Sequence, residues 1–390
     1  MRLSARQLNR TTLQRQLLLA REPLGVVAAV RRLVGLQAQQ AAAPYLALWN
    51  RVAGFDPAGL DEAFAEHRVV KASLLRITLH AVAVEDHPVW HRAMVRTLRN
   101  SRVYDKRFTR TGLTSADADD NLHEALAHLT EPRSNADMEA FLVTRLPEAF
   151  VKHLPEAPEA QPGARGARIW WALRTYAPLI HAPGPHPWTF GPRPVYHAAP
   201  SMPFQGDAGD AMVELARRYL LAYGPATAAD LALFTTVERS PAKAALAALQ
   251  DELVTHTGPD GKPVYDLAGG PIADEDTDAP PRLLGMWDNV VLAHADRTRL
   301  IPEDYRATVI RRNGDVLPMA LVDGYVAGVW RPVERGIEVT AFRRLPRSTW
   351  DGLAAEAADL KALLAGREPL VFSRYGHWWS TIGGAQTRVL

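Results

Sequence analysis

The feature that most constrains this chain is a run of helical segments followed by a β-hairpin, a pattern that occurs three times. In the first copy, apolar residues follow Pro23 at three- and four-residue steps, and Gly35 ends that helix. Further helical segments follow Pro44 and begin at Asp56. The stretch from Val69 to Val84 is rich in β-branched residues with partial alternation, which predicts a hairpin. Helices followed by a hairpin are typical of a winged helix.

The second and third copies repeat this order without repeating the residues. Thr114 to Leu146 is helical, residues 154–166 form a Pro/Gly/Ala-rich loop, and Ile169 to Pro194 supplies a helix and a wing. In the third copy, Ala211 to Tyr223 is a helix and Leu253 to Leu267 is a hairpin that turns at a Gly-Pro-Asp-Gly sequence.

We therefore predict an α+β fold of three tandem winged-helix motifs followed by a β-rich region. An acidic Pro/Gly-rich linker covers residues 268–281, and the strands after it alternate around Asn-Gly and Asp-Gly turns. The predicted domains are residues 1–110, 111–205, 206–270 and 281–390.

The composition excludes several classes of chemistry. The chain has no cysteine, which removes disulfides, thiolate nucleophiles and Cys-ligated zinc. It has no phosphate-binding glycine loop, no HExxH sequence and no Gly-x-Ser-x-Gly sequence. We expect no metal and no cofactor. No apolar run approaches the length of a membrane helix, and the N-terminus does not resemble a signal peptide, so we expect a cytoplasmic protein.

Charge is distributed unevenly along the chain. Residues 1–110 contain 18 Lys/Arg and 8 Asp/Glu, whereas residues 251–280 contain one lysine and eight acidic residues. The chain is also rich in arginine, which a GC-rich coding sequence alone would explain. The asymmetry between segments is harder to explain by codon usage. It indicates a polyanionic partner, with nucleic acid first.

The most informative short segment is Gly35-Leu36-Gln37-Ala38-Gln39-Gln40. If the backbone is extended there, Gln37 and Gln39 point to the same side and Ala38 to the other. In a continuing helix the two glutamines diverge, and the segment is only a polar helix end. A glutamine cannot be a general base, but a pair can position a water and direct carbonyl dipoles toward a developing cation.

An ordered set of motifs resembles the AlkZ/YcaQ-type winged-helix DNA glycosylases over nearly the whole chain. The motifs are Gly35 to Gln39, Arg76-Ile77-Thr78-Leu79-His80, Arg218-Tyr219-Leu220 leading to Gly224-Pro225-Ala226-Thr227, and Trp287-Asp288 followed by Asp296-Arg297. The Gln-x-Gln form is similar to the AlkZ branch and differs from the Gln-x-Asp form of the YcaQ branch. The resemblance implies a C-shaped arrangement of the winged helices.

The resemblance also implies the activity. Members are monofunctional glycosylases that remove N7-alkylguanines and unhook interstrand crosslinks. The resemblance to the AlkZ branch implies that this chain would give an actinomycete self-resistance to azinomycin. It implies that Gln37 and Gln39 are the catalytic pair and that a β-hairpin enters the DNA. We expect this hairpin at Thr308 to Val316, with Arg311 and Arg312 at its tip. Phosphate contacts are expected from Arg96, Arg99, Arg102, Lys106, Arg107 and Arg110. We expect the protein to act on double-stranded DNA as a monomer.

Three other functions stay open at this point. Winged helices mostly read DNA sequence, so a transcription regulator is one alternative. A protein that binds alkylated DNA without releasing a base is another. A YcaQ-like glycosylase with broader substrates is the third. His377-Trp378-Trp379 has two interpretations, a stacking surface for a base or packing of the last strand.

Overall fold

The first winged-helix unit contains the segment singled out above. In a computed structural model, which describes residues 1–146, 169–200 and 204–390, a two-residue strand β1 lies between two helices. Asp56 accepts the Ala58 N–H ahead of α4, which has Pro57 at its first position. The three strands pair antiparallel in the order β1-β3-β2. The elements are α2 (Val26–Arg32), β1 (Leu36–Gln37), α3 (Ala43–Trp49), α4 (Pro57–Ala65), β2 (Val69–Ser73) and β3 (Leu79–Ala83).

The second and third units repeat this order of helices and strands. In the second unit the sheet order is β4-β6-β5, which is again first, third, second. In the third unit, the first strand is reduced to a bridge between Ala226 and Tyr265. The second unit comprises α7 (Ser115–His128), β4 (Arg133–Ser134), α8 (Asn135–Val143), α10 (Ile169–Tyr176), β5 (Leu179–His181) and β6 (Val195–Ala198). The third comprises α11 (Ala208–Tyr223), α12 (Ala228–Thr235), α13 (Arg239–Ala248), β7 (Leu253–Thr257) and β8 (Pro263–Leu267).

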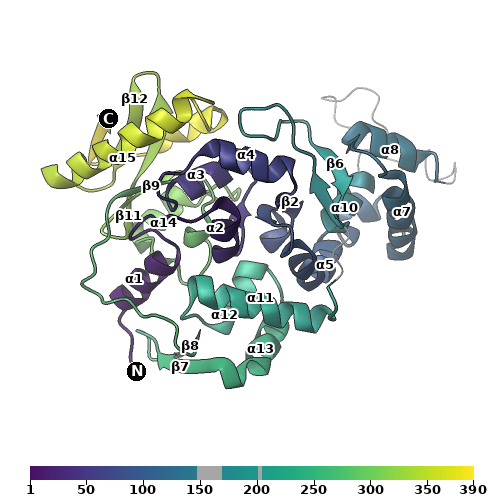
Figure 1. Ribbon diagram of the computed structural model, residues 1–390, viewed down its shortest axis with the longest axis horizontal. Coiled ribbons are helices and arrows are strands. Elements are labelled where there is room, and N and C mark those ends of the chain that lie inside the picture. The colour runs from purple at the N-terminus through teal and green to yellow at the C-terminus, as the bar shows by residue number, and fades with distance from the viewer. Residues whose placement is uncertain (147–168, 201–203) are drawn as a thin grey trace.

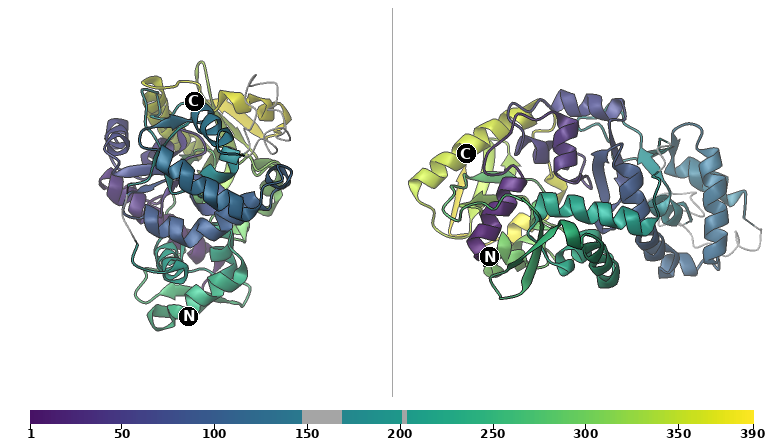
Figure 2. Two further views of the ribbon diagram at one scale, coloured as in Figure 1. Left: turned by 90° about the vertical axis from the view of Figure 1, so that its right-hand side faces the viewer. Right: turned by 60° about the horizontal axis from the view of Figure 1, so that its bottom comes forward.

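These units confirm the predicted fold class of three tandem winged helices with a β-rich C-terminal region. The loop predicted at residues 154–166 lies outside the described residues. The C-terminal region and the second unit lie at opposite ends of the molecule, the first unit lies between them, and the third unit lies below (Figures 1 and 2). One apolar core joins parts of all three units, and a second joins the first unit to the C-terminal region.

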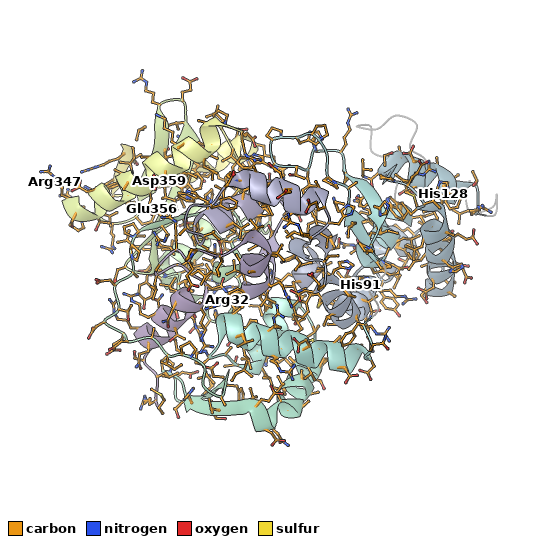
Figure 3. The ribbon with its side chains drawn as sticks, viewed as in Figure 1. Arg32, His91, His128, Arg347, Glu356 and Asp359 are labelled. Carbon is orange, nitrogen blue, oxygen red and sulfur yellow. The ribbon has the colours of Figure 1, made fainter. Side chains whose placement is uncertain are left out.

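The C-terminal region is a five-stranded antiparallel sheet covered by one long helix. The strand order is β13-β12-β11-β10-β9. Helix α15 (Arg347–Ala365) buries Glu356 against the sheet, where it accepts hydrogen bonds from Arg21 and Arg282. Arg347 is exposed at the start of that helix (Figure 3). The strands are β9 (Arg282–Leu284), β10 (Met319–Val322), β11 (Tyr325–Val333), β12 (Gly336–Ala341) and β13 (Gln386–Val389).

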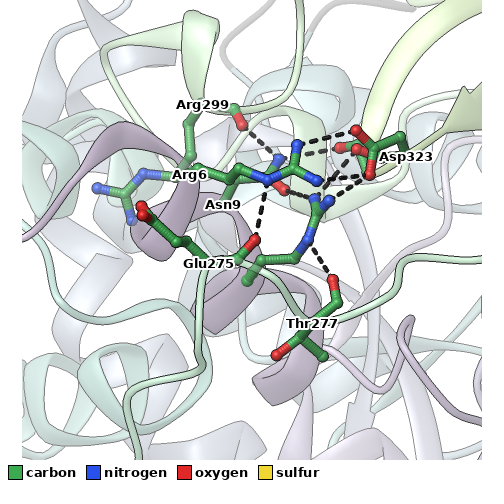
Figure 4. Close-up of polar contacts among 8 residues, drawn as sticks. Arg6, Asn9, Glu275, Thr277, Arg299 and Asp323 are labelled. Carbon is green, nitrogen blue, oxygen red and sulfur yellow. Dashed lines mark hydrogen bonds and ion pairs between the residues drawn. The ribbon is translucent and has the colours of Figure 1, made fainter.

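The N-terminal helix ties the third unit to the C-terminal region. Apolar periodicity predicts a helix from Leu3 to Ala20, but α1 (Ala5–Arg15) ends earlier, and Leu17 is in the left-handed region with φ 57°. The side chain of Arg6 pairs with Asp323 at 2.8 Å in the turn between β10 and β11 (Figure 4). About two and a half turns further along α1, Arg15 forms a buried bidentate pair with Asp266 of β8. These pairs fix the arrangement of segments that are far apart in sequence.

Candidate active site

Gly35 sets the start of the strand that carries Gln37. Its φ of +88° is in the region that favours glycine, and a Cβ there would lie 2.7 Å from Cγ1 of Val82. The chain leaves α2, turns at Gly35 and pairs with β3, so that Gln37 lies opposite His80. The Ala38 N–H donates to Leu79 O at 2.7 Å, which extends the pairing by one residue. The backbone is therefore extended at Gln37, and Gln39 lies in the bend that follows the strand, so the continuing-helix alternative is wrong.

The structure brings Gln37 and Gln39 together at the end of this strand. The side chain of Gln37 is 5% exposed, and its Oε1 accepts the Gln39 N–H at 3.0 Å. Ala38 is buried, whereas Gln39 is exposed to solvent. One glutamine is therefore held rigidly by the loop, and the next reaches the surface. A carbonyl oxygen has two lone pairs, so Oε1 of Gln37 can accept a second donor.

A hydrogen-bonded network behind the strand fixes this loop. Asn289 Nδ2 donates to Gly35 O at 3.0 Å, and Arg76 Nη2 donates to Asn289 Oδ1 at 2.5 Å and to His80 Nε2 at 3.2 Å. Because arginine can only donate, His80 carries its proton on Nδ1, which donates to Thr78 O. Burial, and then the charge of Arg76, lower the pKa of His80 to about 3, so this imidazole is neutral.

The charged side chains around Gln37 and Gln39 are buried and already bonded to other groups of the protein. Arg76 has a backbone φ of 52°, its Nη1 is buried with no hydrogen-bond partner among the described residues, and burial lowers its pKa to about 10. Asp288 gives both carboxylate oxygens to Arg51 at 2.7 and 2.8 Å. Asp288, Arg51 and Gln37 line a small cavity of about 10 Å³, which has room for at most one water. The site therefore presents dipoles rather than a free carboxylate.

An aromatic surface continues from the glutamine loop. Gln40 Nε2 donates to the hydroxyl of Tyr375 at 2.9 Å, and the Tyr375 ring packs edge-on against Trp287 at 5.6 Å. Trp287 Nε1 in turn donates to Gly314 O at 2.8 Å. Trp378 Nε1 donates to Asp315 Oδ2 at 2.8 Å. This surface connects the glutamine loop with the segment that was expected to form a DNA-entering hairpin.

That segment is a turn rather than a hairpin of two strands. Helix α14 (Glu303–Val309) occupies its first residues, and a single bridge joins Ile310 to Val316. Arg311 and Arg312 do lie at its tip. Arg311 is half-buried, donates to Thr381 Oγ1 and lies over the ring of Trp378, whereas Arg312 is exposed. Because Thr308 and Val309 belong to α14, too few extended residues remain for a longer run of β-sheet hydrogen bonds.

The arginines predicted to hold phosphates lie on α5 (His87–Val103) and α6 (Lys106–Thr109). Arg96 is exposed, as are Lys106 and Arg110. Arg99 is paired with Asp119, and Arg107 is paired with Asp105. Arg102 donates to Thr175, and both Arg102 and Arg107 lie over the ring of Trp171. Of the five predicted arginines, Arg96 and Arg110 therefore have the least competition from partners among the described residues.

Sequence reasoning missed Asn289 and Tyr375 as parts of the site. Each comes from more than 200 residues away, and no local spacing links them to the loop. The Trp287-Asp288 motif stood directly before Asn289 and was the available signal. Among the described residues, no three His, Asp or Glu side chains group as they would around a metal ion. None of the described helices is long and apolar enough to span a membrane.

A family model described as DNA glycosylase AlkZ-like matches residues 30–363. The chain belongs to this family. It is therefore a DNA glycosylase, an enzyme class that acts on DNA. The chain is 27% identical over 376 residues to an interstrand DNA cross-link repair glycosylase of Streptomyces sahachiroi, covering 92% of this chain and 96% of that protein. The solved structure of Streptomyces sahachiroi DNA glycosylase AlkZ superposes with a TM-score of 0.77 at 23% identity, covering 95% of this chain and 99% of that one.

Proposed function

We propose that this glycosylase hydrolyses the N-glycosidic bond of N7-alkylguanine in double-stranded DNA, including guanines joined in interstrand crosslinks. Its role would be self-resistance to a DNA-alkylating natural product of the azinomycin type. The observation that carries the proposal is the glutamine pair, with Gln37 held on a fixed strand and Gln39 exposed beside it. The crosslink-repair name of the Streptomyces sahachiroi relative, which matches nearly end to end, supports the substrate class.

The proposed chemistry fits a site without a free acid or base. An N7-alkylated guanine is already cationic, so it leaves as a neutral base and needs no general acid. Positive charge then develops on the sugar. The second lone pair of Gln37 Oε1 and the amide of Gln39 can hold the attacking water and direct carbonyl dipoles at C1′. As the bond from water to C1′ forms and the bond from C1′ to N9 breaks, the water's extra proton passes to solvent, so neither residue has to ionise for this step.

No strand cleavage is expected after base release. A lyase step needs an amine that attacks C1′ to form a Schiff base. The side chains described around the glutamine pair are amides, aromatic rings, an imidazole, guanidinium groups and a carboxylate. None of these is a lysine amine. We propose that the enzyme acts as a monomer near the nucleoid, with Arg96 and Arg312 among its phosphate contacts. Arg99, Arg102, Arg107 and Arg311 would first have to leave internal partners.

Release of free base tests the proposal directly. Duplex DNA carrying N7-methylguanine is incubated with wild type and with Gln37→Ala, Gln39→Ala and the double variant, and free base is separated from DNA. We expect wild type to release the base. Each single variant should lose most of the rate and keep its DNA affinity, because neither glutamine contacts a phosphate in this proposal. A crosslinked duplex is then the second substrate.

Two results would point elsewhere. A stable complex with methylated or crosslinked DNA but no base release would favour a sequestering protein. Binding that depends on sequence and ignores the lesion would favour a regulator. If a variant lost binding while bound DNA still turned over at the normal rate, the assignment of Gln37 and Gln39 to catalysis would be wrong.

A further inference from the structure

The segment η5 (Ser373–Thr381) lies directly beside the glutamine loop. The contact is a hydrogen bond of 2.9 Å from Gln40 Nε2 to the hydroxyl of Tyr375. Gln40 follows Gln39, so a DNA strand that reaches Gln39 passes next to this part of η5. The segment belongs to the C-terminal region, more than 300 residues along the chain, and nothing in the proposed chemistry uses it.

Arg374 on η5 is exposed, and its hydrogen bond and cation–π contact among the described residues are both with its neighbour Tyr375. Its guanidinium lies 4.7 Å from the ring centroid of Tyr375, and Nη2 donates to the Tyr375 hydroxyl. Among the described residues, no carboxylate lies within ion-pair distance of this guanidinium. Glu368 borders the same surface pocket of about 100 Å³, but its Oε2 accepts Trp188 Nε1 at 2.7 Å. The remaining guanidinium N–H groups are therefore available to an anion.

The hydroxyl of Tyr375 adds one more donor at the same place. A phenolic oxygen can accept two hydrogen bonds and donate one. Here it accepts from Gln40 and from Arg374, which both donate to it. Its own hydrogen has no acceptor among the described residues. The side chain itself is held firmly, since it is 7% exposed and its ring packs against Trp287.

The two chain segments that meet at this point contain no acidic residue, although Glu368 borders the pocket and Asp315 accepts from Trp378 of η5. No Asp or Glu occurs from Pro23 to Phe55, the segment that carries the glutamine pair, nor from Pro369 to Leu390, the segment that carries Arg374. A cation with unused donors between two acid-free segments suits a phosphodiester, which offers a single charge and two acceptor oxygens. Duplex DNA presents one phosphate per 3.4 Å along each strand, so a strand at Gln39 brings a phosphate within reach.

We propose that Arg374 and the hydroxyl of Tyr375 form a phosphate clamp that holds the backbone of the DNA strand presented to Gln37 and Gln39. The clamp deepens the proposed function and rests on its placement of the DNA at the glutamine loop. Arg374 supplies charge and Tyr375 supplies a fixed neutral donor. The clamp positions the DNA backbone and takes no part in bond cleavage.

Salt-dependent affinity for undamaged duplex DNA tests the clamp without any need for excision. Arg374→Gln should weaken binding about tenfold, the loss of a charge-assisted hydrogen bond, and should lower the slope of log K against log salt by about one. Arg374→Lys should keep the slope because it keeps the charge. Tyr375→Phe should weaken binding while the slope stays unchanged. The matched control is Arg347→Gln, an exposed arginine at the N-terminal end of α15, a helix about 28 Å long whose C-terminal end precedes η5 in the chain.

The outcomes separate the clamp from the proposed function. If Arg374→Gln behaves like Arg347→Gln, or weakens binding with the salt slope unchanged, the clamp is refuted. Thermal unfolding of each variant identifies any loss of DNA affinity that comes from misfolding. If Arg374→Gln does not fold normally, Arg374→Lys decides whether the charge at this position contributes to the salt slope. If wild type releases no N7-methylguanine while Arg374→Gln still lowers the slope, the clamp stands and the proposed substrate falls. If wild type excises N7-methylguanine normally and Arg374→Gln has no effect on binding, the proposed substrate stands and the clamp is refuted.

Discussion

Replacing Asp288 by asparagine tests how much the buried ion pair under the glutamine loop contributes to stability. Asp288 accepts two hydrogen bonds from Arg51 at 2.7 and 2.8 Å, and the two side chains are 3% and 2% exposed. Arg51 also donates to Ala47 O, and Asp288 caps the N–H of Val290. Asparagine keeps the shape of the carboxylate but leaves the guanidinium buried without a counter-charge.

The size of the effect follows from that burial. Removing one partner of a buried pair costs about 3–5 kcal/mol, because the remaining charge stays out of water. Unfolding entropy is about 2.1 cal/mol/K per residue, so 390 residues that unfold together give about 0.8 kcal/mol per degree. We therefore expect Asp288→Asn to lower Tm by about 4–6 °C. A larger shift is expected if the first unit unfolds by itself.

Differential scanning calorimetry measures the shift, with two comparisons. Glu66→Gln removes an exposed pair with Arg68, whose side chains are 54% and 45% exposed, and should change Tm little. The double variant Arg51→Met, Asp288→Asn should recover part of the loss, since no buried charge remains unpaired. If Asp288→Asn shifts Tm no more than Glu66→Gln, or if the double variant is worse than the single one, the reasoning from burial is refuted.

Three further predictions follow from the same region and from α8. Gly35→Ala should lower the free energy of unfolding by about 1–3 kcal/mol and slow single-turnover excision. Gly54 also has a positive φ of +63° but open space around it, so Gly54→Ala should lose only the smaller conformational contribution, and urea denaturation compares the two variants. Burial raises the pKa of Glu139 from 4.5 to about 8, so between these pH values the carboxyl is protonated in the folded protein and ionised in the unfolded one. The free energy of unfolding of wild type therefore falls by about 1.4 kcal/mol per pH unit as the pH rises through this range. Glu139→Gln should remove this loss, seen as a gain over wild type at pH 8.5 and none at pH 4.5. The excision rate at saturating enzyme should be flat from about pH 5 to 9, because the pKa of His80 is about 3 and that of Arg76 about 10; an inflection near neutral pH would contradict a site of amides.

Much of the fold was readable from local sequence. Capping residues and β-branched runs locate the hairpin at Val69–Val84 and the helix at Ala211–Tyr223, and the structure places elements there. These signals act within a few residues, where backbone preference and side-chain capping decide the conformation. The predicted helix from Leu3 to Ala20 was wrong at its C-terminal end, where tertiary packing overrides the local apolar pattern. Its apolar period continues past Arg15, but Leu17 turns into the left-handed region to fill the core.

The site was readable only in part. An extended backbone at Gln37 could be proposed from the helix stop at Gly35, because a glycine with positive φ ends a helix. The network that holds the strand could not be proposed. Arg76 and Asn289 meet through tertiary packing of segments 213 residues apart, and no spacing rule encodes such a meeting. Arg99 and Arg107 show the converse, since charge alone did not reveal that carboxylates neutralise them.

A site built from dipoles restricts which bases can leave. The carboxylate that lines the cavity with Gln37 is paired with Arg51, and the imidazole opposite Gln37 stays neutral, so neither is placed to protonate a departing base at neutral pH. The buried charge of Arg76 also disfavours a strong net attraction for a cationic sugar. If Gln37 and Gln39 act as proposed, the enzyme supplies only the part of the barrier that positioning and carbonyl dipoles lower. An undamaged guanine would still need an acid to leave. Selectivity for N7-alkylated guanine would then come from the lesion's own positive charge, which would let such a site act on adducted guanines and spare normal DNA.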